Sequence, residues 1–241
     1  MKKFILLLFF LICVLLPDTK AQEAKSLWID MRAGINTSFI INQNAYGNGE
    51  LDYATTFGFT AGAGAGYFLS DKWGVTTSLT WAKIGQNYSG TQSSGDATRK
   101  VRLNYIELPF MAMRKTEASQ RPTWIAFGPE LMFLTGAKQD YHRENGGTLP
   151  KGENMVEGIT DIKDRYKPVD VALNLSLNKI YDIYENRKLR MLVSANMAIG
   201  LTDINSRDWH TPNLKNKYSG SHNFYIGIKV AVMYRAFIKK E

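Results

Sequence analysis

Eight segments of this chain alternate apolar and polar residues with a period of two, and no other feature of the sequence limits its fold as strongly. In the first segment Ile29 and Met31 share one parity, whereas Asp30 and Arg32 share the other. The eight segments are 27–39, 57–69, 73–81, 105–112, 124–133, 170–177, 189–201 and 224–235. A period of two places successive side chains on opposite faces of a strand. Each segment is therefore predicted to be a β-strand with one apolar face, and the fold class to be all-β.

The connections between these segments differ in length in a regular way. The long ones follow the first, third, fifth and seventh segments, at residues 40–55, 85–100, 136–168 and 203–222. Outer-membrane barrels have an even number of antiparallel strands of about ten residues, with long outer loops and short periplasmic turns. The sequence therefore predicts an eight-stranded antiparallel transmembrane up-and-down β-barrel. We expect it in the outer membrane of a Gram-negative bacterium, with the N- and C-termini in the periplasm.

The first residues of the chain are typical of an exported protein. Lys2 and Lys3 precede an unbroken apolar run at 4–16, and the small residues Thr19 and Ala21 fit a signal-peptidase site. The apolar run is too short to span a bilayer stably as a helix. We therefore expect a cleaved signal peptide at residues 1–21 and one outer-membrane barrel domain at residues 22–241.

The residues that most often carry chemistry are not spaced as a catalytic or metal site requires. The only cysteine, Cys13, lies in the apolar run, and His142, His210 and His222 have no metal-ligand spacing to one another. We therefore expect no cofactor, no metal and no catalytic site. One alternative stays open, because Ser221 beside His222 could belong to a barrel-wall enzyme that modifies lipid A.

The polar parity of the predicted strands would face the barrel interior, and it carries charges of both signs. The expected lumen charge network consists of Asp30, Arg32, Glu107, Glu130, Asp170, Arg190, Lys229 and Arg235. An eight-stranded barrel has room inside for side chains and little else, so these charges should pair in a filled interior that conducts no ions. Glu107 is predicted to be a central member, with Arg32 or Arg190 as its partner.

Five stretches of the sequence carry a resemblance to a known family. They are residues 33–36 (AGIN), 66–73 (GYFLSDKW), 103–110 (LNYIELPF), 127–131 (FGPEL) and 200–204 (GLTDI). In these stretches the chain resembles the PorT-like outer-membrane β-barrels of Bacteroidetes, and the stretch at 103–110 is the most specific. The resemblance implies the barrel fold and the outer membrane. The founding member of that family is linked to type IX protein secretion, while most relatives have no assigned role.

The expected function is a structural or interaction role in the cell envelope. The formal net charge is +8, but the basic residues are spread along the chain, which indicates lipid phosphates at least as well as nucleic acid. We expect outer-membrane lipid and lipopolysaccharide as partners, and no nucleic acid. Envelope or secretion proteins are further candidates, met at the outer loops or periplasmic turns. An accessory role in type IX secretion and lipid A modification are the alternative functions.

Overall fold

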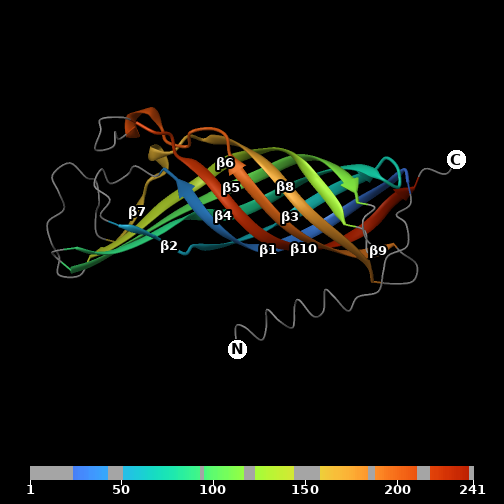
Figure 1. Ribbon diagram of the computed structural model, residues 1–241, viewed down its shortest axis with the longest axis horizontal. Helices are drawn as coiled ribbons and strands as arrows, with labels where there is room; N and C mark the ends of the chain where they lie inside the picture. Colours follow the sequence, from blue (N-terminus) through green and yellow to red (C-terminus); the bar gives the residue numbers. More distant parts are fainter. Residues whose placement is uncertain are drawn as a thin grey trace.

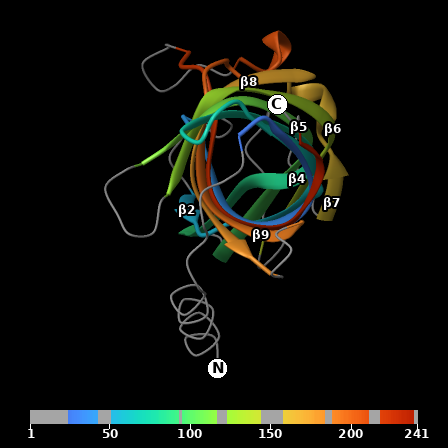
Figure 2. The same ribbon diagram turned by 90° about the vertical axis from the view of Figure 1, so that its right-hand side faces the viewer.

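The computed structural model describes residues 24–42, 51–92, 95–116, 123–143, 158–183, 188–210 and 218–238. Eight long strands form a barrel, seen from the side in Figure 1 and from one end in Figure 2. They are β1 (Ser26–Ile41), β3 (Phe57–Phe68), β4 (Trp73–Gln92), β5 (Gly95–Lys115), β6 (Trp124–Arg143), β8 (Val169–Asp182), β9 (Leu189–Gly200) and β10 (His222–Ile238). The predicted signal peptide at 1–21 lies outside the described residues.

Short elements lie between the long strands at one end of the barrel, on the left in Figure 1. Strand β2 (Asp52–Ala54) pairs with β4, and β7 (Gly158–Asp161) pairs with β6. Two short 3-10 helices are η2 (Lys163–Arg165) and η3 (Arg207–Trp209). We call this end the long-loop end and the opposite end, where β3 turns directly into β4, the short-turn end. No helix in the described ranges is long and apolar enough to cross a membrane.

The sheet closes on itself. Each barrel strand pairs antiparallel with the barrel strands before and after it, and β1 pairs with β10 from Ser26 opposite Ile238 to Ile41 opposite His222. Closure leaves no barrel strand with an open edge. The predicted all-β, eight-stranded antiparallel barrel is confirmed.

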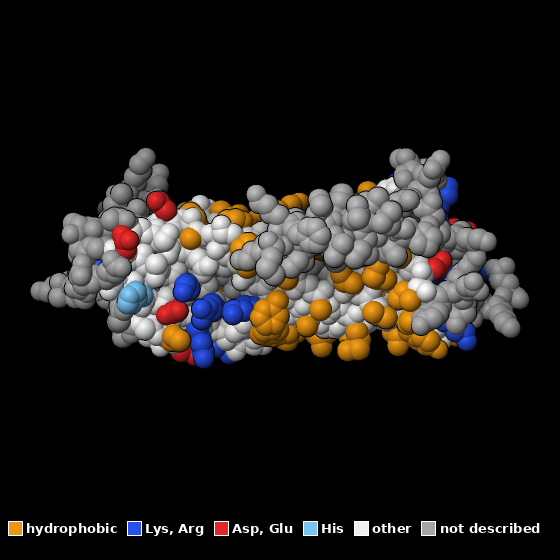
Figure 3. Space-filling model, turned by 90° about the horizontal axis from the view of Figure 1, so that it is seen from below, with side chains coloured by type: hydrophobic (Ala, Val, Ile, Leu, Met, Phe, Trp, Pro, Cys, Tyr) orange, Lys and Arg blue, Asp and Glu red, His pale blue; other side chains and the backbone are white. Residues whose placement is uncertain are grey.

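The alternation places apolar side chains outside and polar side chains inside along the middle of the barrel. On β1, Ile29 and Met31 are 48% and 75% exposed, whereas Asp30 is 7% exposed. Figure 3 shows many of the outward apolar side chains on one face of the molecule. A barrel with an apolar exterior of this kind is suited to a surrounding of lipid.

Strands β4, β5 and β6 extend furthest beyond the segments that the sequence predicts. Residues 85–92 and 95–100 are not a loop, because they belong to β4 and β5, which pair with each other up to Gln92 opposite Gly95, and β6 continues from residue 136 to Arg143. The alternation is reversed in this extension: Tyr88 and Val101 face inward and are buried, while Lys100 faces outward and is exposed. Strands that project beyond a membrane meet water outside, so their apolar side chains must face inward.

Candidate functional site: the barrel interior and its long-loop end

The eight charges predicted for the lumen lie on the inward parity of their strands. Asp30, Glu107, Glu130, Asp170 and Arg190 are buried, and Arg32, Lys229 and Arg235 are half-buried. Their contacts join some of them and leave others apart: Glu107 lies beside both Lys229 and Glu130, whereas the pair of Asp30 and Arg32 has its own contacts. Some of the partners are neutral.

The first contact is an ion pair between Asp30 and Arg32 on β1. The Arg32 guanidinium donates from Nε and Nη2 to the two carboxylate oxygens of Asp30, both at 2.7 Å. The pair occupies the space beside Gly64 on the neighbouring strand, where a Cβ would lie 2.1 Å from Arg32 Nη2. The glycine therefore makes room for the ion pair.

Glu107 on β5 faces Lys229 on β10. Lys229 Nζ lies 3.7 Å from Glu107 Oε2, and the Glu107 side chain is 2% exposed. The prediction of Arg32 or Arg190 as the partner is wrong. Both arginines have a carboxylate closer to them, since Arg32 binds Asp30 and Arg190 Nε lies 2.6 Å from Asp182 Oδ1.

Two further carboxylates are held by neutral donors. The Tyr225 hydroxyl donates to both oxygens of Glu130, at 2.8 and 2.9 Å, and Asn174 Nδ2 donates to it as well. Asp170 accepts from Asn223 Nδ2 at 2.9 Å. Buried polar groups are tolerated when they are hydrogen-bonded in this way.

Arg190 and Arg235 both lie near the indole ring of Trp28. Their guanidinium carbons are 4.6 and 5.8 Å from the ring centroid. Sequence reasoning missed Asp182, the acidic neighbour of Arg190. Asp182 continues the inward parity of Asp170 at the end of β8, so a longer predicted strand would have found it.

Apolar side chains fill the lumen towards both ends. At the long-loop end the cluster includes Ile40, Ile84, Tyr88, Val101, Leu103, Tyr105, Met132, Leu134, Ile162, Tyr166 and Ile204. At the short-turn end it includes Trp28, Phe68, Met111, Met113, Trp124, Ile180 and Met233. A cavity of about 50 Å³ lies beside the ion pairs, lined in part by Arg32, Asn196 and Lys229. This volume accommodates a few water molecules but no larger solute.

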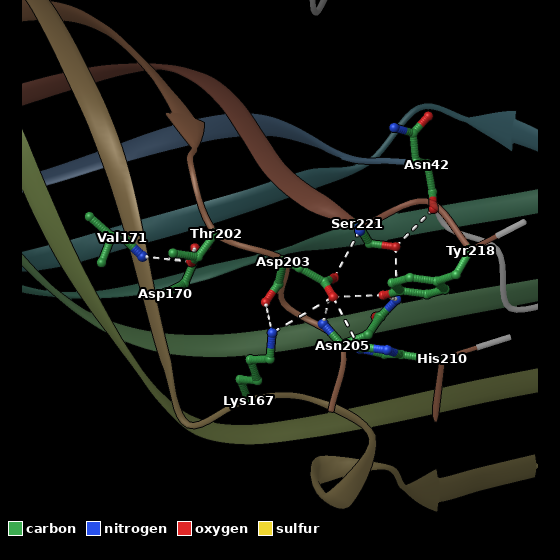
Figure 4. Close-up of polar contacts among 10 residues, drawn as sticks. All are labelled: Asn42, Lys167, Asp170, Val171, Thr202, Asp203, Asn205, His210, Tyr218 and Ser221. Atoms are coloured by element: carbon green, nitrogen blue, oxygen red, sulfur yellow. Dashed lines mark hydrogen bonds and ion pairs between the residues drawn. The ribbon is translucent and has the colours of Figure 1, made fainter. Parts of the chain in front are cut away.

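Asp203, in the connection between β9 and β10, is the centre of a polar cluster at the long-loop end (Figure 4). Its Oδ1 accepts from the backbone N–H groups of Asn205 at 3.2 Å and Ser221 at 2.9 Å, and its Oδ2 accepts from the Tyr218 hydroxyl at 2.7 Å. Lys167 Nζ donates to the Asp203 carbonyl oxygen at 2.8 Å and lies 3.7 Å from Oδ2. The cluster ties the β9–β10 connection to the segment before β8.

The hydrogen bonds of this cluster determine the charge of Asp203. Burial alone would raise its pKa, but the hydrogen bonds from Tyr218, Ser221 and Asn205 and the charge of Lys167 outweigh burial, and they hold the pKa below the ordinary 3.8. Burial, followed by the hydrogen bond to Asp203, raises the pKa of Tyr218 to about 12. At neutral pH, Asp203 is therefore ionised and Tyr218 is protonated, as their hydrogen bond requires. In the sequence, the signal for Asp203 is its place in residues 200–204, one of the stretches that resemble the PorT-like family.

The lowered pKa predicts that the cluster loosens in acid. A carboxylate with a lowered folded-state pKa stabilises the fold above its unfolded pKa, here about 4, and this contribution is lost as the pH falls through the folded pKa. We expect the amides of Asn205 and Ser221 to be protected from hydrogen exchange at neutral pH and to lose protection below about pH 4. In Asp203→Asn the protection should be weak at every pH. Equal protection in the variant and the wild type at neutral pH would show that the carboxylate does not hold the connection.

Ser221 is placed as a structural residue of the same cluster. Its hydroxyl donates to the Asn42 carbonyl oxygen at 2.8 Å and accepts from Asn205 Nδ2 at 2.9 Å, and the residue is 0% exposed. A nucleophile must reach its substrate, so this geometry gives no support to an acyl-hydrolase reading of Ser221 and His222. In the described part of the chain, no group of three His, Cys, Asp or Glu residues could hold a metal ion.

Comparison with known proteins agrees with the closed barrel. The family described as "Outer membrane protein beta-barrel domain" matches residues 20–206. The chain belongs to this family. The family match ends before β10, which completes the barrel in the structure. A search of curated proteins gave no match.

Solved structures of small outer-membrane proteins resemble this member of the family. Neisserial surface protein A is 11% identical, with a TM-score of 0.43, and the match covers 88% of this chain and 99% of that chain. OprG from Pseudomonas aeruginosa is 12% identical, with a TM-score of 0.41, and the match covers 91% of this chain and 100% of that chain. Ail of Yersinia pestis, in complex with the heparin analogue sucrose octasulfate, is 9% identical, with a TM-score of 0.36 and coverage of 87% and 99%. At these identities the likeness extends to the fold alone.

Proposed function

We propose that this barrel is a non-enzymatic structural or interaction protein of the cell envelope, whose contacts are made by its surfaces rather than through its lumen. The filled interior is the observation that carries the proposal. Apolar clusters occupy the lumen towards both ends, and the charges between them have partners inside the barrel. Among the described residues, this packing favours contacts made on the outside of the barrel over passage of a solute through it.

A basic surface at the long-loop end supports lipopolysaccharide phosphates as a partner. Lys100, Arg102 and Lys138 face outward on β5 and β6, with Arg102 directly opposite Lys138, and Lys83 faces outward on β4. Asp140 neutralises part of this charge, at 4.0 Å from Lys100 and 3.8 Å from Arg102. In Figure 3, basic side chains lie beside the apolar surface towards this end. Cations next to an apolar belt are suited to lipid phosphate groups.

The proposed orientation places the long-loop end outside the cell and the termini in the periplasm. Asp208 at the long-loop end and Asp71 at the short-turn end are both exposed, and the chain has no cysteine after Cys13. We expect a membrane-impermeable maleimide added to intact cells to label Asp208→Cys and to leave Asp71→Cys unlabelled until the outer membrane is opened. The wild type is the control for background labelling. Labelling of Asp71→Cys alone in intact cells would mean that the orientation is inverted.

The filled lumen predicts that the barrel does not conduct. Purified protein inserted in a planar lipid bilayer should give no steady ion current, whereas an open porin measured in the same bilayer gives one. Insertion is checked independently, because a folded closed barrel migrates faster on a denaturing gel before heating than after it. Large, steady conductance from heat-modifiable protein would refute the closed interior.

The interaction role competes with two other functions, and one experiment separates them. The PorT-like resemblance suggests an accessory role in type IX secretion. The adjacent Ser221 and His222 suggest an enzyme that modifies lipid A. The experiment deletes the gene and compares the secreted proteins, the lipid A structures and the permeability of the envelope. We expect altered envelope integrity with secreted proteins and lipid A unchanged. Loss of secreted proteins would support the secretion role instead, and a changed acylation of lipid A would support an enzyme.

A further inference from the structure

The outer wall of the barrel is not smooth at the short-turn end. Two open apolar grooves of about 500 and 480 Å³ lie side by side over β3, β4, β5 and β6. Ala112 on β5 lines both of them. The grooves therefore meet at this residue.

The small side chain of Ala112 explains the depression. In the register of the sheet Ala112 lies between Val75 on β4 and Phe127 on β6. Along β5, the outward residues two positions away are Phe110 and Arg114. All four neighbours are larger than alanine, so they form walls around a floor made by Ala112. The first groove continues over Ala65 and Thr77, which are also small.

Two basic residues lie at the end of this apolar surface. Arg114 faces outward, and Lys115, the last residue of β5, lies on the inward parity at the rim of the barrel; both line the second groove with Trp73, Thr116 and Ile125. The guanidinium carbon of Arg114 is 5.2 Å from the centroid of the Trp73 ring. No acidic residue is among the described residues that line either groove. Tryptophan and arginine at the edge of an apolar belt are typical of the level of lipid headgroups.

We propose that the two grooves form a binding site for one glycerophospholipid. An acyl chain lies over Ala112 and into the groove towards Ala65, and the lipid phosphate is bound by Arg114 and Lys115. The apolar floor alone would accept any lipid chain, and the cations alone would accept any phosphate. Because the apolar floor and the cations are joined at Ala112, the site favours a ligand that carries both an acyl chain and a phosphate. The site rests on the membrane location given by the family, and the proposed orientation places it in the periplasmic leaflet.

The test measures lipid that stays bound to the purified barrel. The protein is refolded in a non-ionic detergent with dioleoyl phosphatidylglycerol, and the retained lipid is counted by native mass spectrometry. Ala112→Leu fills the groove without changing charge, and the double variant Arg114→Gln and Lys115→Gln removes the cations without filling it. The matched controls are Ala195→Leu and Lys179→Gln, which change outward residues of β9 and β8 away from the grooves. Heat-dependent gel mobility establishes that each protein is folded.

We expect the wild type and both controls to retain one phosphatidylglycerol molecule. Loss of each cation should weaken retention about fivefold, and Ala112→Leu should abolish it. Equal retention by Ala112→Leu and the wild type would overturn the proposal, as would equal retention by the double variant. Equal retention of dioleoylglycerol would overturn the phosphate contact, and displacement of the lipid by millimolar inorganic phosphate would show a site for free phosphate instead. None of these outcomes depends on conductance or labelling, so the site can fail while the proposed function stands.

Discussion

Replacing Glu107 with alanine is expected to lower the free energy of unfolding by about 3 to 5 kcal/mol, because the change strands Lys229 inside the barrel. The ammonium group of Lys229 lies 3.7 Å from the carboxylate, and its side chain is only 14% exposed. Lys229 Nζ is also 5.9 Å from the centre of the Tyr225 ring, which alone cannot replace a carboxylate. The measurement is urea unfolding of the refolded barrel in detergent or lipid vesicles, followed by gel mobility.

The control for Glu107→Ala is Asp208→Ala, which removes an exposed carboxylate at the long-loop end. A substitution at such a surface position should change the unfolding free energy by less than about 0.5 kcal/mol. The double variant Glu107→Ala with Lys229→Met should recover part of the loss, because no buried charge is left unpaired. Similar losses of unfolding free energy in Glu107→Ala and Asp208→Ala would mean that water in the lumen solvates Lys229. The ion pair would then contribute nothing measurable to stability.

The sequence predicted which residues face the lumen but not which of them meet. Alternation assigns a face to Glu107, Arg190 and Lys229, because a strand has only two faces and one of them is apolar. Pairing depends on register and on side-chain reach across the lumen, and a single sequence specifies neither. Arg32 or Arg190 is therefore predicted beside Glu107, whereas Arg32 binds Asp30 and Arg190 lies against Asp182. The partners of Glu130 are the neutral residues Tyr225 and Asn174, which opposite charge on the inward parity does not predict.

The extension of β4 and β5 was missed for a different physical reason. The predicted strands are defined by an apolar outward face, and on β4 that face extends only as far as Trp81. From there the apolar residues change parity, so that Ile84 and Tyr88 face inward while Lys83 faces outward. A strand that leaves lipid for water needs this reversal, since its exposed face is now hydrated. The position at which the parity reverses in a barrel sequence therefore indicates the boundary of the membrane as well as the continuation of the strand.

The Asp203 cluster could not have been derived from alternation at all. Asp203 follows the end of β9, and its partners Tyr218 and Ser221 are more than a dozen residues away in the chain. Irregular backbone has no period from which a facing direction could be inferred. The cluster forms because the connection after β9 brings Tyr218 and Ser221 back to Asp203, and the sequence pattern does not give the course of that connection.

Trp28→Ala is expected to destabilise the barrel by at least as much as Glu107→Ala. Trp28 is 0% exposed at the short-turn end, and its indole N–H donates to Ser26 Oγ at 2.9 Å. Truncating a buried aromatic side chain costs about 3 to 5 kcal/mol through lost burial and the cavity that remains. The guanidinium of Arg190 lies 4.6 Å from the ring centroid, so the change also removes the apolar and π contact of a buried cation.

Trp209→Ala is the matched control for Trp28→Ala. Trp209 also lies under an arginine, with the guanidinium carbon of Arg165 at 4.3 Å from its ring centroid, but it is half-buried in η3, outside the barrel. The two substitutions remove the same side chain and a similar cation–π contact, so their difference in unfolding free energy isolates burial within the lumen. We expect Trp209→Ala to cost about 1 kcal/mol or less, since exposed cation–π contacts contribute about 0.5 to 1 kcal/mol. If urea unfolding gives equal losses for the two variants, the short-turn end of the lumen is hydrated rather than packed, and Trp28 does not close it.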